Sequence, residues 1–182
     1  MNPTLVKVLY AVAWTATWWA LILSATGDCL PWMLAGAYGL LLAHLIVARA
    51  QWRDWLPSVI GACLAAILID GVLATLGILS FAHHELPAPV PPLWILCLWL
   101  WFALAFHNCL NWLHGRIVIA ILFGTISAVA GYYGGMHFGV VTTSIAPAAA
   151  LGLIAAGFAL VTPLFAQIAP AESNTGEQLN VA

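Results

Sequence analysis

The sequence predicts an all-α integral membrane protein, a bundle of six transmembrane helices with both termini in the cytoplasm. Three observations predict this class: 64% of the 182 residues are hydrophobic, only 5% are charged, and the apolar residues fall into six long runs. A soluble domain has about 25% charged and about 45–50% apolar residues. The composition therefore excludes a soluble enzyme and a disordered linker. Four Lys plus Arg are also too few to bind a nucleic-acid backbone.

Six apolar runs are each close to the length of about 20 residues that a transmembrane helix needs. They cover about residues 5–23, 30–48, 56–79, 93–113, 117–133 and 149–168. The first run holds three tryptophans and is followed by no clean small-x-small cleavage site, so we interpret it as a span rather than a signal peptide. Short loops join the runs, which predicts one six-span transmembrane domain over residues 1–169. Residues 170–182 are polar and without periodicity, which predicts a disordered cytoplasmic tail.

The basic residues predict the orientation of the bundle. Lys7 precedes the first run, Arg49 and Arg53 lie between the second and third, and Arg116 lies between the fourth and fifth. With six spans, all four fall on the same side of the membrane. The positive-inside rule makes that side cytoplasmic, and it places both termini there.

Asp70 lies near the middle of the third run, where an ionised side chain costs about 2.5–3.5 kcal/mol on insertion scales. An ionisable group at this depth indicates a functional site. We expect a neutral Asp70 that is hydrogen-bonded inside the bundle. The candidate partners are His107, His44, the hydroxyls of Thr15, Thr17, Thr125 and Ser127, and water. A purely structural carboxyl that bonds a neighbouring helix is the alternative.

The fourth run carries the densest set of polar residues, including His107, Asn111 and His114. At about 100° per residue these three form one stripe on a single helix face. We therefore hypothesise that Asp70, His107 and Asn111 are catalytic residues. A proton relay, a metal site built from His44, His107 and His114, and interhelical hydrogen bonds alone are the alternatives.

The fifth run and the residues after it carry glycines at a spacing of four, Gly131, Gly135 and Gly139. Small residues at this spacing let helix backbones approach closely. The pattern predicts packing against another helix, within the bundle or in a homo-oligomer. For Tyr132 and Tyr133 we expect the usual anchoring role at a membrane interface.

Several segments together resemble a known family: IDGVLATLGILSF at 69–81, HNCLNWL at 107–113, and the glycines and tyrosines between 124 and 139. They resemble a family of small multi-pass bacterial inner-membrane proteins catalogued as a domain of unknown function. The resemblance implies a location in the bacterial inner (cytoplasmic) membrane and no established activity. Its members are encoded beside enzymes that resemble fatty-acyl-modifying methyltransferases and flavin amine oxidases, which implies envelope lipid metabolism.

The functional hypothesis is a membrane-embedded component of envelope lipid modification, either an enzyme or an accessory subunit. Membrane lipids are its expected partners, together with membrane or peripheral enzymes; the sequence leaves the cofactor open. A proton-coupled small-molecule carrier that titrates at Asp70 and His107 is the second hypothesis. A structural membrane partner protein is the third.

Overall fold

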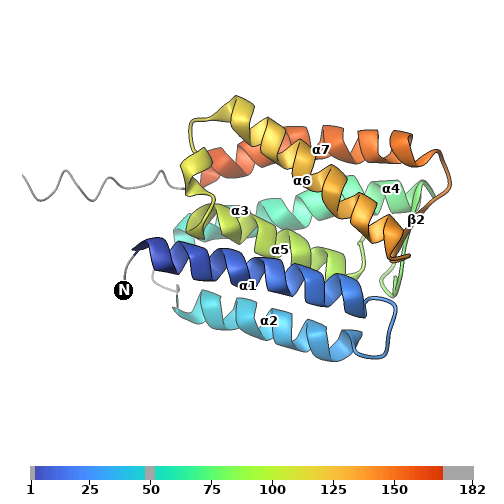
Figure 1. The fold of residues 1–182 in the computed structure, drawn as a ribbon, viewed down its shortest axis with the longest axis horizontal. Helices are drawn as coiled ribbons and strands as arrows, with labels where there is room; N and C mark the ends of the chain where they lie inside the picture. Colours follow the sequence, from blue (N-terminus) through green and yellow to red (C-terminus); the bar gives the residue numbers. More distant parts are fainter. Residues whose placement is uncertain (1–2, 48–51, 170–182) are drawn as a thin grey trace, which may run out of the picture.

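Six long helical elements lie side by side and run alternately up and down the bundle (Figure 1). The computed structural model describes residues 3–47 and 52–169, so Arg49 and the predicted tail 170–182 lie outside the described residues. The elements are α1 Pro3–Ser24, α2 Leu30–Val47, α3 Trp52–Ala66, α4 Val72–Thr75, α5 Leu93–Asn108, α6 Ile117–His137 and α7 Pro147–Ile168. A π-helical turn, Ile67–Gly71, joins α3 to α4 in one continuous element. The predicted all-α class is confirmed.

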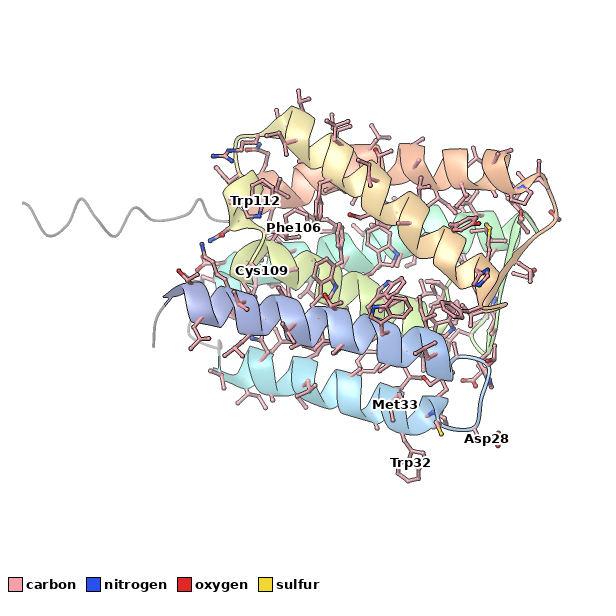
Figure 2. The ribbon with its side chains drawn as sticks, in the orientation of Figure 1. Asp28, Trp32, Met33, Phe106, Cys109 and Trp112 are labelled. Carbon is pink, nitrogen blue, oxygen red and sulfur yellow. The ribbon has the colours of Figure 1, made fainter. Side chains whose placement is uncertain are left out.

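Four of the elements are long and apolar enough to cross a membrane, counted over the described residues alone. They are α2, the element Trp52–Thr75, α6 and α7. Large apolar side chains are exposed along the helices; Trp32, for example, is 77% exposed and projects away from the bundle (Figure 2). Exposed apolar surface of this extent is typical of a protein whose helices face lipid.

A short antiparallel ribbon closes one end of the bundle, and the sequence had not indicated it. Strand β1, Leu79–Phe81, pairs with β2, Val141–Thr143. The third run was predicted to be helical as far as residue 79, but the helix ends at Thr75. Gly77 follows with a positive φ of 68°, a conformation that ends a helix and that glycine adopts without strain.

Helix α5 also ends earlier than the sequence predicted, at Asn108 instead of residue 113. The N–H groups of Cys109 and Leu110 both donate to the Ala105 carbonyl, each over 2.8 Å, which breaks the regular helical pattern. Residues Asn111–Leu113 form a separate 3₁₀ turn. The prediction that His107, Asn111 and His114 share one helix face is therefore wrong.

Helices α6 and α7 pack closely against each other, and a glycine permits the approach. A Cβ atom added at Gly124 of α6 would overlap the Thr162 side chain of α7. Elsewhere on α7, a Cβ at Gly157 would lie 2.9 Å from Ile69 Cδ1 in the π turn. The α6–α7 pair thus packs, through α7, against the π turn Ile67–Gly71 that carries Asp70.

Candidate functional site

Asp70 is fully buried, and both of its carboxyl oxygens are hydrogen-bonded inside the bundle. The indole Nε1 of Trp99 on α5 donates to Oδ2 over 2.6 Å, and the Tyr132 hydroxyl on α6 donates to Oδ1. The prediction of a hydrogen-bonded Asp70 is confirmed, but its protein partners are Trp99 and Tyr132 instead of the expected His107, His44 or a threonine or serine hydroxyl. Asp70 sits in the π turn, and such turns occur frequently at functional sites because they redirect one side chain.

The two partners of Asp70 were hidden among residues with ordinary roles. Tyr132 was expected at a membrane interface, yet its side chain points inward, while the adjacent Tyr133 is 63% exposed. Trp99 is one of ten tryptophans. A buried tyrosine hydroxyl or indole N–H usually has a hydrogen-bond partner, and a carboxyl offers acceptors for two of them. That complementarity is the signal that could have identified Asp70, Trp99 and Tyr132 as a hydrogen-bonded trio.

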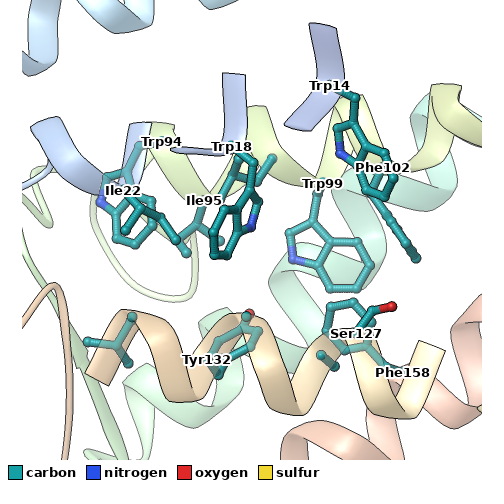
Figure 3. Close-up of a pocket in the computed structure, with 15 residues that line it drawn as sticks. Trp14, Trp18, Ile22, Trp94, Ile95, Trp99, Phe102, Ser127, Tyr132 and Phe158 are labelled. Carbon is teal, nitrogen blue, oxygen red and sulfur yellow. The ribbon is translucent and has the colours of Figure 1, made fainter. Parts of the chain in front are cut away.

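Trp99 and Tyr132 also form part of the wall of a cavity of about 110 Å³ (Figure 3). Helices α1 and α6 supply opposite walls, and α5 lies between them. The aromatic lining residues are Trp14, Trp18, Trp94, Trp99, Phe102, Tyr132 and Phe158. Trp99 is stacked on Phe158 of α7, with ring centroids 4.6 Å apart and planes 29° apart. The carboxyl of Asp70 thus holds two rings that shape an aromatic cavity.

The small residues of α6 give this cavity its space. Gly131 and Gly135 both line it. A Cβ at Gly131 would lie 3.5 Å from Trp18 Cζ2, and a Cβ at Gly135 would lie 3.0 Å from Val141 Cγ2. Gly139 lies beyond the end of α6, in a turn with φ of 73°. The predicted glycine ridge therefore faces the chain's own α1 and β2 at two of its three positions.

The structure does not bring the three predicted catalytic residues together. His107 Nε2 is 2.7 Å from Ser58 Oγ, a hydrogen bond that joins α5 to α3. Asn111 lies in the 3₁₀ turn, and its buried Oδ1 has no partner among the described residues. Within the described part of the chain, no hydrogen bond links Asp70 to either of them.

The alternative metal site is not assembled either. His114 Nδ1 donates to the carbonyls of Ala166, over 3.1 Å, and Ala169, over 2.9 Å, at the end of α7. Over residues 3–47 and 52–169, no three His, Cys, Asp or Glu side chains are grouped so that they could hold a metal ion. His44, His107 and His114 thus do not form one ligand set.

A proline-rich loop, residues 82–92, packs onto the π turn beside Asp70. A Cβ at Gly71 would overlap the backbone carbonyl of Pro89, so the loop backbone touches the helix directly. His84 Nε2 donates to the Val90 carbonyl, and Trp94 Nε1 donates to the Ala82 carbonyl, each over 2.9 Å. These bonds hold the loop in place over this end of the site.

The sequence model of one protein family, described as "Protein of unknown function (DUF2878)", matches residues 7–164. The chain belongs to the DUF2878 family. The predicted resemblance to a domain of unknown function is confirmed, and the range matched by DUF2878 includes Asp70, Trp99 and Tyr132. Comparison with curated proteins and with solved structures finds no match.

Proposed function

We propose that this DUF2878 protein binds an apolar group of a membrane lipid in the aromatic cavity, as an enzyme or accessory subunit of envelope lipid modification. The observation that carries the proposal is the cavity itself, which is lined mainly by residues of α1, α5 and α6, two of which, Trp99 and Tyr132, are hydrogen-bonded to the buried Asp70. Apolar walls with a few placed polar groups are typical of ligand sites, and buried ionisable groups in membrane helices mark functional positions.

The size of the cavity limits what part of a lipid it can hold. An apolar cavity of about 150 Å³ binds benzene, whereas pockets for drug-sized ligands reach about 300–1,000 Å³. A cavity of about 110 Å³ therefore suits a ring-sized group or a short length of hydrocarbon chain. The rest of the lipid would stay outside the cavity. Asp70 acts in this proposal as a positioning residue, because it fixes Trp99 and Tyr132.

The lipid hypothesis is favoured over a proton-coupled carrier by the placement of the titratable groups. The carrier hypothesis pairs Asp70 with His107, but the hydrogen bonds of Asp70 come from Trp99 and Tyr132, and His107 bonds Ser58. His107 and Asn111 remain candidates for a separate polar role beyond the cavity. A peripheral enzyme partner also remains part of the proposal, whereas a homo-oligomer would need a surface other than Gly131 and Gly135, which face the chain's own α1 and β2.

Filling the cavity tests the proposed function. Ala128 is 4% exposed and lines the cavity, so we expect Ala128→Phe to abolish occupation by a lipid chain. The measurement is photo-crosslinking of a phospholipid with a diazirine-bearing acyl chain, in nanodiscs, with the labelled peptides mapped by mass spectrometry. Wild-type protein should be labelled at the α1 and α6 residues that line the cavity, and the variant should lose that labelling.

Ile126→Phe is the matched control, because Ile126 is two residues away on α6 and 66% exposed. This variant should keep the wild-type labelling of the cavity. A strain that carries only Ala128→Phe should also show an altered lipid profile. Equal cavity labelling in Ala128→Phe and wild type would show that no lipid group enters the cavity.

We further propose that all six elements cross the bacterial inner membrane, with both termini in the cytoplasm. Lys7, Arg53 and Arg116 lie at the beginnings of elements that run in the same direction along the bundle, which supports this orientation. An alkaline phosphatase fused after the C-terminus should be inactive, and one inserted in the loop 82–92 should be active. The opposite pattern of activity would show that both termini lie outside the cytoplasm.

A further inference from the structure

The cavity wall carries hydrogen-bond donors that the protein itself does not use. Four tryptophans line the cavity. Two donate their indole N–H inside the protein, Trp94 to the Ala82 carbonyl and Trp99 to Asp70. The other two, Trp14 and Trp18, have no hydrogen-bond partner for this group among the described residues, and neither has the hydroxyl of Ser127.

Trp14 and Trp18 are placed to act on one ligand. They are four residues apart on α1, so they lie on the same helix face. In Figure 3 their indole nitrogens lie on the sides of the two rings that face each other. Their positions are fixed by ring contacts, Trp14 with Phe102 at 6.2 Å between centroids and Trp18 with Trp19 at 5.0 Å. Two donors therefore point into one region of an otherwise apolar site.

The chemistry of these groups selects the kind of atom that they can bind. An indole N–H donates and cannot accept, so its partner must be an acceptor. The buried carboxyl of Asp70, which is bonded to the lining residues Trp99 and Tyr132, already receives hydrogen bonds on both of its oxygens. No Lys or Arg lines the cavity, so a negatively charged acceptor would be buried without compensation. A neutral oxygen on an apolar group meets all of these conditions.

We propose that the apolar group bound in the cavity carries a carbonyl oxygen, which accepts hydrogen bonds from Trp14 and Trp18. This inference rests on the proposed function, since it names the chemistry of the lipid group that the cavity would hold. An acyl carbonyl on a chain and a ketone on a ring share this chemistry. Both are neutral, and both place the acceptor at the edge of an apolar body.

The test uses two matched pairs of small probes and protein in detergent micelles labelled with ¹⁵N at the tryptophan indoles. Toluene and benzaldehyde are ring probes without and with a carbonyl, and heptane and 2-heptanone are the corresponding chain probes. We expect a carbonyl probe to bind about two- to tenfold more tightly than its hydrocarbon, referenced to the probe concentration within the micelle. The indole resonances of Trp14 and Trp18 should shift with the carbonyl probe, and that of exposed Trp32 should not. The pair of probes with the larger carbonyl-to-hydrocarbon affinity ratio shows whether the site prefers a carbonyl on a ring or a carbonyl on a chain.

Removal of the donors provides the second arm. Trp14→Phe with Trp18→Phe keeps aromatic rings but removes both N–H groups, so the carbonyl-to-hydrocarbon affinity ratio should fall to about one. Each single variant should have an affinity ratio between those of the wild type and the double variant, and Trp32→Phe should keep the wild-type ratio. Equal binding of hydrocarbon and carbonyl to the wild type would overturn the carbonyl proposal and leave lipid binding intact. If no probe shifts any indole of the cavity, the proposed function itself fails.

Discussion

Asp70→Leu is expected to lower the free energy of unfolding by about 2–6 kcal/mol. The substitution leaves the Trp99 N–H and the Tyr132 hydroxyl without their acceptor, and each buried polar group left unpaired costs about 1–3 kcal/mol. Asp70→Asn should cost only about 1 kcal/mol, because the amide oxygen can accept from Trp99 while the amide nitrogen donates to the Tyr132 oxygen. Unfolding of the purified protein in one detergent, followed by circular dichroism, measures both variants.

Asp54→Leu is the control for loss of a carboxylate as such. Asp54 is exposed in the first turn of α3, and a surface substitution changes stability by about 0.5 kcal/mol or less. The near-ultraviolet signal of the stacked Trp99 and Phe158 should also weaken in Asp70→Leu and persist in Asp70→Asn. If Asp70→Leu unfolds like the wild type, the carboxyl does not hold the two rings in place.

Gly71→Ala is expected to destabilise the protein by about 1–3 kcal/mol or more. The added Cβ would overlap the Pro89 carbonyl, which is backbone and cannot swing aside as a side chain can. The loop 82–92 must therefore move away from the π turn. We expect a lower melting temperature together with faster proteolytic cleavage of this loop.

Gly36→Ala in α2 is the matched control for this variant. A Cβ at Gly36 has no heavy atom within 4 Å, and alanine is favoured over glycine in a helix interior by about 0.5–1 kcal/mol. This variant should equal or exceed the wild type in stability. Equal melting temperatures for Gly71→Ala and Gly36→Ala would show that the contact with Pro89 is not tight.

Composition and run length were sufficient to predict the helical class, and the cost of a carboxyl among apolar residues was sufficient to single out Asp70. Its partners could not be predicted in the same way. Trp99 and Tyr132 lie 29 and 62 residues further along the chain, on two other helices. Their identity depends on the depth and rotation of three elements, and no pattern within one run contains that information.

The prediction that His107, Asn111 and His114 share one helix face was wrong for a different reason. Helical periodicity places residues on a common face only while the helix continues. Helix α5 ends where its polar residues begin, and the Asn108 side chain donates to the Leu104 carbonyl over 2.7 Å in the last turn. Polar residues close to a helix end satisfy backbone groups that lack helical partners. Glycines were more direct signals of where helices end. Gly77 follows α4 and Gly139 follows α6, and each adopts the positive φ that ends a helix.

The π turn at Ile67–Gly71 means that the aim of Asp70 depends on register rather than on its own side chain. A π turn contains one residue more than the α-helical turn that it replaces. Conversion of this turn to α-helix would rotate Asp70 by about 100° relative to α3, since each residue of an α-helix turns the chain by that angle. Both hydrogen bonds of Asp70 would break together while the span itself stayed helical. The added residue of this turn is thus what allows one carboxyl to connect the element of α3 to α5 and α6.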